Sequence, residues 1–275
     1  MASICLGICG ITTRINLINA VGFHLDIRKR YRNFLKPGHR LLDIDLSIRI
    51  TDNIGDAETP PSVSMANKTI RIRGSRITCN IHRNRGRWKG SGSIEENIYQ
   101  FDTLLRLLYS HIMLKDNGFL IHACGIRNNN DGYLFAGRSG SGKTTLARKT
   151  PYQDVLSDEL VGLRLSDSNP VLMGTPFWGE FQKGGQPVSC ALKGIYFLSK
   201  GIRPKLIPLP PVLALKKLLK LVLFFGKGVH SATATQKMLH SAAGYLLGKG
   251  AKQINLAKNT PYKTVLRMIS HNGKQ

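Results

Sequence analysis

The chain has 275 residues, with 40 Lys and Arg against 16 Asp and Glu, so its formal net charge is +24. Hydrophobic residues make up 42% of the sequence, which is ordinary for a globular protein and excludes an intrinsically disordered chain. The five cysteines are odd in number and include no Cys-x-x-Cys pair, which argues against a structural zinc site and a secreted disulfide framework. We therefore expect a cytoplasmic protein. No stretch reaches about 18 uncharged apolar residues, so we expect no integral membrane segment.

Residues 1–94 are predicted to form a small β-rich region. Four segments alternate apolar and polar residues, which is the period of a half-buried strand. These segments are residues 23–27, 42–50, 69–73 and 77–82. Gly74-Ser75 predicts a turn between the last two segments, and Pro60-Pro61 favours a loop over residues 52–67.

A helix is predicted next, with Ser93 and Glu96 as its capping box. Its apolar side consists of Leu104, Leu105, Leu107, Leu108 and Ile112. Strands are predicted at residues 119–126, 133–136, 155–158 and 192–198, and a helix from about residue 143. Three more helices are expected near residues 212–225, 233–247 and 261–270. This succession predicts an α/β domain over residues 95–275.

Residues 137–144 read Gly-Arg-Ser-Gly-Ser-Gly-Lys-Thr and match the phosphate-binding loop, or Walker A motif. Glycines allow backbone N–H groups to turn inward around phosphate oxygens, and the following helix presents further N–H groups. Lys143 would reach the β- and γ-phosphates, and the Thr144 hydroxyl would ligate Mg²⁺. The pattern is compatible with ATP or GTP. The expected nucleotide-binding residues are Gly137, Arg138, Ser139, Gly140, Ser141, Gly142, Lys143, Thr144 and Thr145.

Asp158 and Glu159 follow the predicted strand at residues 155–158 and supply the acidic partner that a phosphate-binding loop needs for its metal. Two adjacent acids at a strand end fit a metal ligand and a base. The alternative is a pair of surface acids in a turn. We favour the metal reading, with Thr144 and Asp158 as ligands.

The motifs at residues 120–126, 132–147, 156–160, 174–180 and 192–198 resemble the catalytic domain of the HPr serine kinase/phosphorylase family, which is related to phosphoenolpyruvate carboxykinase. The resemblance covers about residues 95–270. It implies a phosphotransferase that acts on a hydroxyl with ATP as donor. Asp158 takes the position of the first acid of the family's Asp-Asp pair, which is associated with metal binding and activation of the attacking serine. Glu159 stands at the second position. His122 matches a family histidine beside the loop, and the alternative is a half-buried strand histidine whose hydrogen bonds are satisfied. The resemblance also raises a homo-oligomer as an expectation.

Two other features carry weaker expectations. Phe177 and Trp178 would pack an adenine or a peptide side chain, or else belong to the core, and Glu180 would touch substrate or metal through water. Six arginines between residues 71 and 87 form a basic run without nearby stacking aromatics, which is typical of a solvated face more than of a nucleic-acid site. No acidic residue follows Glu180. We interpret that stretch as a docking surface for an acidic substrate.

Together these features predict an ATP- and Mg²⁺-dependent kinase that phosphorylates a hydroxyl, by resemblance a serine, of a protein or small peptide. The catalytic residues would be His122, Lys143, Asp158 and Glu159. One alternative is a non-catalytic ATP-binding accessory or regulatory module. Another is a nucleic-acid-associated ATPase. The sequence leaves open the acceptor and the direction of the reaction.

Overall fold

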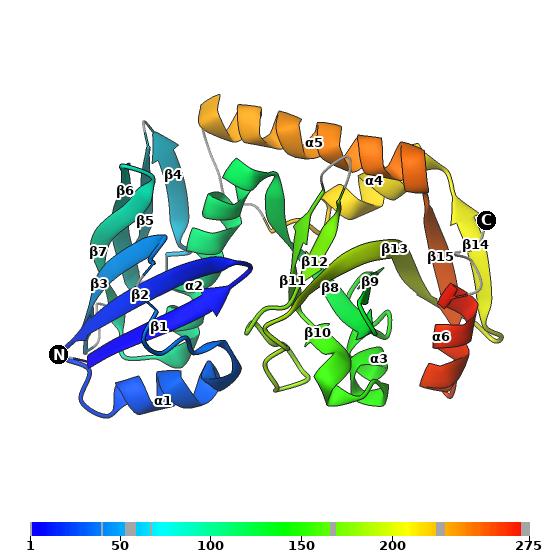
Figure 1. The fold of residues 1–275 in the computed structure, drawn as a ribbon, viewed down its shortest axis with the longest axis horizontal. Coiled ribbons are helices and arrows are strands. Elements are labelled where there is room, and N and C mark those ends of the chain that lie inside the picture. Colours follow the sequence, from blue (N-terminus) through cyan, green and yellow to red (C-terminus); the bar gives the residue numbers. More distant parts are fainter. Residues whose placement is uncertain are drawn as a thin grey trace. The chain divides into compact units, whose positions relative to one another are not determined.

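The computed structural model describes residues 2–39, 41–52, 59–66, 68–165, 169–223 and 229–270. It is a mixed α/β protein with one sheet of seven strands and one of eight, and six α-helices in the described part. The chain divides into two compact units (Figure 1), which are residues 1–115 with 224–235 and residues 116–223 with 236–275. Within the described ranges, none of the helices combines the length and apolar character that crossing a bilayer requires.

The first unit is built on the seven-stranded sheet. In spatial order its strands are β1 (Ala2–Ile8), β2 (Ile11–Ile18), β3 (Ile44–Thr51), β7 (Arg87–Glu95), β6 (Ile77–Asn84), β5 (Thr69–Gly74) and β4 (Ser62–Ala66). The pairs β2–β3 and β3–β7 are parallel, and the others are antiparallel. Alternate residues of β1, β2, β3, β5 and β6 are buried, so the sheet has one apolar face and one polar face.

Two expectations in this unit, one of a strand and one of a loop, are wrong. Residues 23–27 lie in helix α1 (Phe23–Arg30), where Phe23 and Ile27 are buried and Leu25 is 60% exposed. In a segment of only five residues, alternation also places the first and last apolar side chains, Phe23 and Ile27, four positions apart. That separation is about one turn of a helix, so the pattern fits both structures. Within the expected loop 52–67, Ser62–Ala66 form β4 because they pair with β5; residues 53–58 and 67 lie outside the described residues.

Helix α2 (Ile98–Ile112) covers the apolar face of the same sheet and packs on β5, β6 and β7. The capping expectation is wrong, because Ser93 lies in β7 and the Asn97 side chain accepts the Tyr99 N–H at 2.8 Å. The apolar side expected for this helix is confirmed, since all five of its residues are buried. We expected a domain boundary between residues 94 and 95. The division between the two compact units falls after residue 115, so α2 belongs to the first unit.

The second unit is built on the eight-stranded sheet. Its main path runs β10 (Val155–Ser157), β8 (Gly118–Asn128), β11 (Leu160–Arg164), β12 (Val171–Met173), β13 (Ser189–Lys200), β15 (Ala251–Leu256) and β14 (Lys205–Leu209). Strand β9 (Asp131–Ala136) pairs with both β8 and β13. Strands β9, β13 and β15 are parallel neighbours, so their carboxyl ends meet at one edge of the sheet.

The three helices expected in the C-terminal part are present, and one of them is shorter than expected. Helix α4 (Pro211–Leu219) ends earlier than expected, because Val222 forms a β-bridge with Ile121 instead of extending the helix. Phe225, at the end of the expected helix, lies outside the described residues. Helices α5 (Val229–Lys249) and α6 (Tyr262–Ser270) cover the other two expected helical segments.

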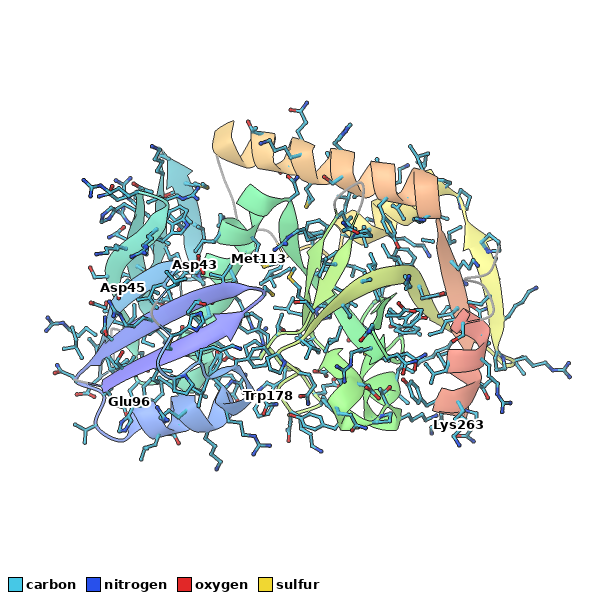
Figure 2. All side chains as sticks on the ribbon, viewed as in Figure 1. Asp43, Asp45, Glu96, Met113, Trp178 and Lys263 are labelled. Carbon is cyan, nitrogen blue, oxygen red and sulfur yellow. The ribbon has the colours of Figure 1, made fainter. Side chains whose placement is uncertain are left out.

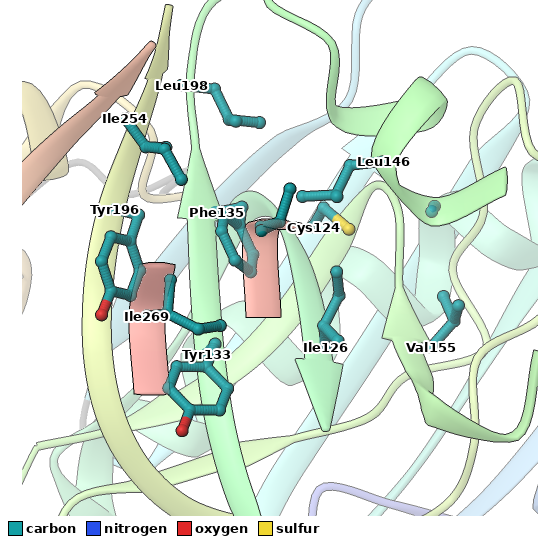
Figure 3. Packing of buried hydrophobic residues seen from close by; sticks show 12 residues of the cluster. Cys124, Ile126, Tyr133, Phe135, Leu146, Val155, Tyr196, Leu198, Ile254 and Ile269 are labelled. Atoms are coloured by element: carbon teal, nitrogen blue, oxygen red, sulfur yellow. The ribbon is translucent and has the colours of Figure 1, made fainter. Parts of the chain in front are cut away.

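An apolar cluster fixes helix α3 (Lys143–Lys149) and α6 on the central strands of this sheet (Figure 3). The rings of Phe135 and Tyr196 stack with centroids 5.4 Å apart, which joins β9 to β13. Leu146 of α3 and Ile269 of α6 pack into the same cluster. The strands and α3 are therefore held rigidly on both sides of the loop that connects β9 to α3.

Candidate nucleotide-binding site

Residues 137–142 connect β9 to α3 in a backbone conformation that depends on glycine. Gly140 and Gly142 have φ values of +73° and +107°, in the left-handed region that side chains disfavour. At Gly137 a Cβ atom would lie 2.4 Å from the Ser141 Oγ atom. The Ser141 N–H donates to the Arg138 carbonyl at 3.1 Å and closes the turn. The glycines of the motif are thus required by the local geometry of the loop.

Lys143 opens α3, and its side chain folds back into the loop. It is only 7% exposed, and its Nζ atom donates to the carbonyl oxygens of Gly137 at 2.9 Å and Arg138 at 3.2 Å. Burial lowers the pKa of this ammonium group, against the opposing charge of Glu159 and, more weakly, of Asp158. Among the described residues, no carboxylate lies within 4.0 Å of Nζ. The ammonium group is held by main-chain oxygens alone.

The acidic pair lies in the tight turn between β10 and β11. Ser157 fixes this turn: its Oγ atom donates to the Phe177 carbonyl at 2.8 Å and accepts the N–H groups of Glu159 and Leu160 at 3.2 Å each. The two acids therefore start from a rigid backbone, and their side chains have different surroundings.

Asp158 is the buried member of the pair, with 2% of its surface exposed. Its two carboxylate oxygens accept the N–H groups of Gly179 at 3.3 Å and Phe181 at 3.1 Å. Burial raises the pKa of this carboxyl group, although the two backbone hydrogen bonds oppose that shift. Asp158 thereby anchors the segment 177–181 beside the site.

Glu159 is the more exposed member of the pair. Its Oε1 atom lies 3.4 Å from Nδ1 of His122, which is on the neighbouring strand β8. The Glu159 backbone is fixed as well, because its carbonyl accepts the Ala123 N–H at 3.1 Å. On its other side, a Cβ atom at Gly179 would lie 2.5 Å from Oε2. The carboxylate therefore lies between His122 and the bare backbone of Gly179.

A cleft of about 890 Å³ opens at these residues, all of it in the second unit. The structure brings together in its lining Ser139, Gly140, Ser141, Gly142, Lys143, Thr144 and Thr145 with His122, Asp158 and Glu159. Gly137 and Arg138 do not line the cleft; their carbonyl oxygens accept hydrogen bonds from Lys143 Nζ. Glu180 lines it, as expected for a residue near substrate or metal.

The aromatic pair expected beside the nucleotide does not line the cleft. Phe177 is fully buried, and its carbonyl accepts the Ser157 hydroxyl. Trp178 (labelled in Figure 2) is half-buried and is also absent from the lining. Phe177 belongs to the core, as the alternative expectation had it, and a stacking role for the pair has no support in this geometry.

The remainder of the lining comes from residues that the sequence pattern did not single out. They lie at or just after the carboxyl ends of β13 and β15 or belong to α3 and α6: Leu146, Lys149, Lys200, Gly201, Leu256, Ala257, Lys258, Thr260 and Val265. Lys149 Nζ donates to the carbonyls of Lys258 at 2.9 Å and Thr260 at 3.0 Å, which fixes the 258–260 segment against α3. Only the parallel order of β9, β13 and β15 could have indicated this part of the site.

A divalent metal ion would need ligands beyond the protein side chains. In the described ranges, no three His, Cys, Asp or Glu side chains group into a metal site of their own. Mg²⁺ is typically held by one or two carboxylates together with phosphate oxygens and water. The hydroxyl of Thr144 and the carboxylates of Asp158 and Glu159 fit that donor set, because each carboxylate oxygen retains a second lone pair.

Comparison with known proteins adds no relative. No family model matches the chain, and no curated protein is found that matches it. The resemblance to the HPr kinase family rests on the sequence motifs alone, and the function has to be argued from the site.

Proposed function

We propose that the protein is an ATP- and Mg²⁺-dependent phosphotransferase that phosphorylates a hydroxyl, with serine of a protein or peptide as the acceptor, in a domain of the HPr kinase/phosphoenolpyruvate carboxykinase type. The observation that carries the proposal is the cleft itself. It gathers Lys143 of a phosphate-binding loop, a carboxylate pair and His122 at one end of three parallel strands. Such strand ends are the usual place for ligands in α/β proteins.

The nucleotide would extend along the cleft from the loop. The loop N–H groups and Lys143 would bind the β- and γ-phosphates, and Lys143 would exchange its bonds to Gly137 and Arg138 for phosphate oxygens. The apolar side chains of Leu256, Ala257 and Val265 offer a surface for the nucleoside in the rest of the lining. A volume of about 890 Å³ lies within the range of small-molecule sites.

Thr144 and Asp158 would hold Mg²⁺ together with phosphate oxygens. Bound there, the ion would neutralise the charge that develops on the phosphates. Asp158 has a second role that needs no metal, since it fixes the 177–181 segment through the Gly179 and Phe181 N–H groups.

Glu159 is the better placed of the two acids to accept the proton of the acceptor hydroxyl. It lines the cleft and its Oε1 atom lies 3.4 Å from Nδ1 of His122, whereas both carboxylate oxygens of Asp158 accept backbone N–H groups. The hydroxyl oxygen forms a bond to the γ-phosphorus, the bond from that phosphorus to the β,γ-bridging oxygen breaks, and ADP leaves. The hydroxyl proton passes to the Glu159 carboxylate, which His122 orients.

The proposal includes a cytoplasmic location for the protein. All five cysteines are free, and four of them are buried. Free thiols support a reducing, cytoplasmic compartment.

The test is transfer of label from γ-labelled ATP to a set of acidic serine peptides. Lys143→Ala should abolish transfer, while Lys263→Ala, which removes an exposed cation from α6 outside the cleft, should retain it. Both variants should melt within a few degrees of the wild type, so that a loss of transfer reports on the site. Equal transfer by Lys143→Ala and wild type would contradict the proposal.

One observation favours a second candidate, an ATP-binding accessory module that transfers nothing. Both Asp158 oxygens already accept backbone hydrogen bonds, so the carboxylate is less available to a metal than in a fully open site. Binding of ATP without transfer or phosphate release would support that candidate. Phosphate release stimulated by DNA or RNA and steeply dependent on salt would instead indicate a nucleic-acid-associated ATPase.

A further inference from the structure

The polar face of the seven-stranded sheet is a surface that the nucleotide site does not use. The apolar face is covered by α2, whose Tyr109 hydroxyl bonds the Thr13 hydroxyl of β2 at 2.6 Å. On the opposite side, alternate residues of β3, β7, β6 and β5 are polar and exposed or half-exposed. We call this side the outer face and define it by Ser47, Arg49, Arg71, Arg73, Asn80 and Ser91.

Strand register arranges the outer face in rows. One row crosses the sheet from Arg73 through Thr78 and Ser93 to Arg49, since these residues pair strand by strand. The next row runs from Arg71 through Asn80 and Ser91 to Ser47. Short hydroxyl and amide side chains thus form a floor between long arginines, and Thr78 and Ser93 are joined by a hydrogen bond of 2.9 Å.

The charge of the outer face is one-sided. Its central acid is Asp45 (labelled in Figure 2), which Arg14 binds with two hydrogen bonds and Asn16 with a third. Glu95, at the end of β7, lies 3.3 Å from Arg76. Among the described residues, no carboxylate lies within 4.0 Å of Arg49, Arg71 or Arg73. Within the described ranges, these three guanidinium groups carry no internal ion pair, which leaves their charge for an external anion.

The spacing of the arginines favours a particular kind of anion. Arg71 and Arg73 are two residues apart on one strand, so their side chains leave the sheet about 6.7 Å apart. An extended peptide presents alternate side chains at the same spacing. Single-stranded nucleic acid would need several aromatic platforms, whereas in the described part of this face no Phe, Tyr or Trp side chain is present and His82 is the one imidazole; Trp88 points into the core.

We propose that the outer face docks an extended acidic peptide segment of a partner, with carboxylates at alternate positions on Arg71 and Arg73 and its polar backbone over the hydroxyl floor. This surface is independent of the nucleotide cleft and lies in the other unit. The docking of an acidic substrate expected on the acid-free C-terminal stretch stays a separate prediction.

The test is fluorescence anisotropy of the full chain at low salt with a labelled peptide in which Glu and Ser alternate. A peptide of the same composition with its Glu residues in one block, and a short DNA duplex, serve as competing probes. The alternating peptide should bind most tightly. Tighter binding of the block peptide would overturn the spacing argument, and tighter binding of the duplex would identify a nucleic-acid surface instead.

A pair of variants locates the surface. Arg71→Glu with Arg73→Glu should weaken binding of the alternating peptide by about tenfold or more, because two attractions become repulsions. The matched control is Arg203→Glu with Lys205→Glu, which makes the same charge change at two exposed positions with the same separation in the second unit. Equal losses in both variants, with both melting as the wild type does, would overturn the outer face as the site.

Discussion

The two units each contain a buried aspartate, and the two aspartates are held in opposite ways. Asp102 on α2 is bound by side chains: the charged Arg30 through two hydrogen bonds, the neutral Tyr31 hydroxyl through another, and the charged Arg106 at 3.9 Å. Asp158 in the second unit is bound by backbone N–H groups. Lys143, the buried cation in the same cleft, is likewise bound by backbone carbonyls.

This difference distinguishes a structural ion pair in the first unit from the candidate ligand-binding site in the second unit. The charges of Asp102 and Arg30 neutralise each other, with side chains only 5% and 8% exposed, and the pair joins α1 to α2. In the second unit, main-chain dipoles hold a cation and an anion apart within one cleft. A charge that is solvated only by the backbone can still exchange those bonds for a ligand.

The largest expected effect is on the structural pair. Asp102→Ala should lower the free energy of unfolding of the first unit by about 3–5 kcal/mol, because it leaves Arg30 charged and buried without its partner. Urea unfolding followed by the fluorescence of Trp88 measures this, in a Trp178→Phe background so that the signal comes from the first unit alone.

Arg106→Ala is the matched control for that variant. Arg106 lies 3.9 Å from Asp102 and is partly exposed, so its loss should cost less than about 1 kcal/mol. A cost for Asp102→Ala as small as that of Arg106→Ala would show that the buried pair does not hold the two helices together.

The next effect concerns the position of Glu159. Gly179→Ala would place a methyl group 2.5 Å from Oε2 and displace that carboxylate, because its side chain is the flexible partner in the contact. We expect phosphoryl transfer to slow by about 10- to 100-fold while nucleotide affinity stays within about twofold of the wild type. Single-turnover transfer and a binding titration separate the two quantities.

Gly248→Ala provides the control for the added methyl group. Gly248 lies on α5 with open space around its Cα atom, so the substitution should leave transfer unchanged. An unchanged transfer rate in Gly179→Ala as well would argue against Glu159 as the proton acceptor.

The smallest effect is a pH dependence of stability. The pKa of Asp158 is raised in the folded state from an ordinary value of 3.8. Between the pKa of the unfolded chain and the higher pKa of the folded chain, the folded chain therefore binds more protons. Stability therefore falls as pH rises through that window, by at most about 1.4 kcal/mol per pH unit for one proton. Relative to Asp158→Asn, the wild type should lose stability as pH rises above 3.8, measured by urea unfolding at a series of pH values. A difference that grows in the opposite direction would mean that the backbone N–H groups outweigh burial.

The sequence by itself located the loop and the strands around the candidate site of the second unit. The motif at residues 137–144, the strand before it and the strand that ends at Ser157 all lie where the pattern predicted them. This was possible because a strand, a glycine-dependent turn and a helix start are encoded by neighbouring residues. The apolar side of α2 was predictable for the same reason, since it repeats over four turns.

Local pattern was insufficient where segments are short or where pairing is long-range. Residues 23–27 fit both the strand and the helix period, and packing of Phe23 and Ile27 selected the helix. Strand β4 forms because β5 offers it an edge. The cap of α2 depends on where β7 ends, so Asn97 and not Ser93 became the capping residue.

Tertiary structure alone decided the form of the site. The cleft is completed by residues 200–201 and 256–260, which reach the loop only because β13 and β15 run parallel to β9. The two acids at positions 158 and 159 are adjacent in sequence, and their surroundings differ because the backbone N–H groups of Gly179 and Phe181 bind Asp158 while Glu159 lies beside His122. Residue type and spacing determine which groups are present, whereas burial and hydrogen bonding from distant segments determine what each group can do.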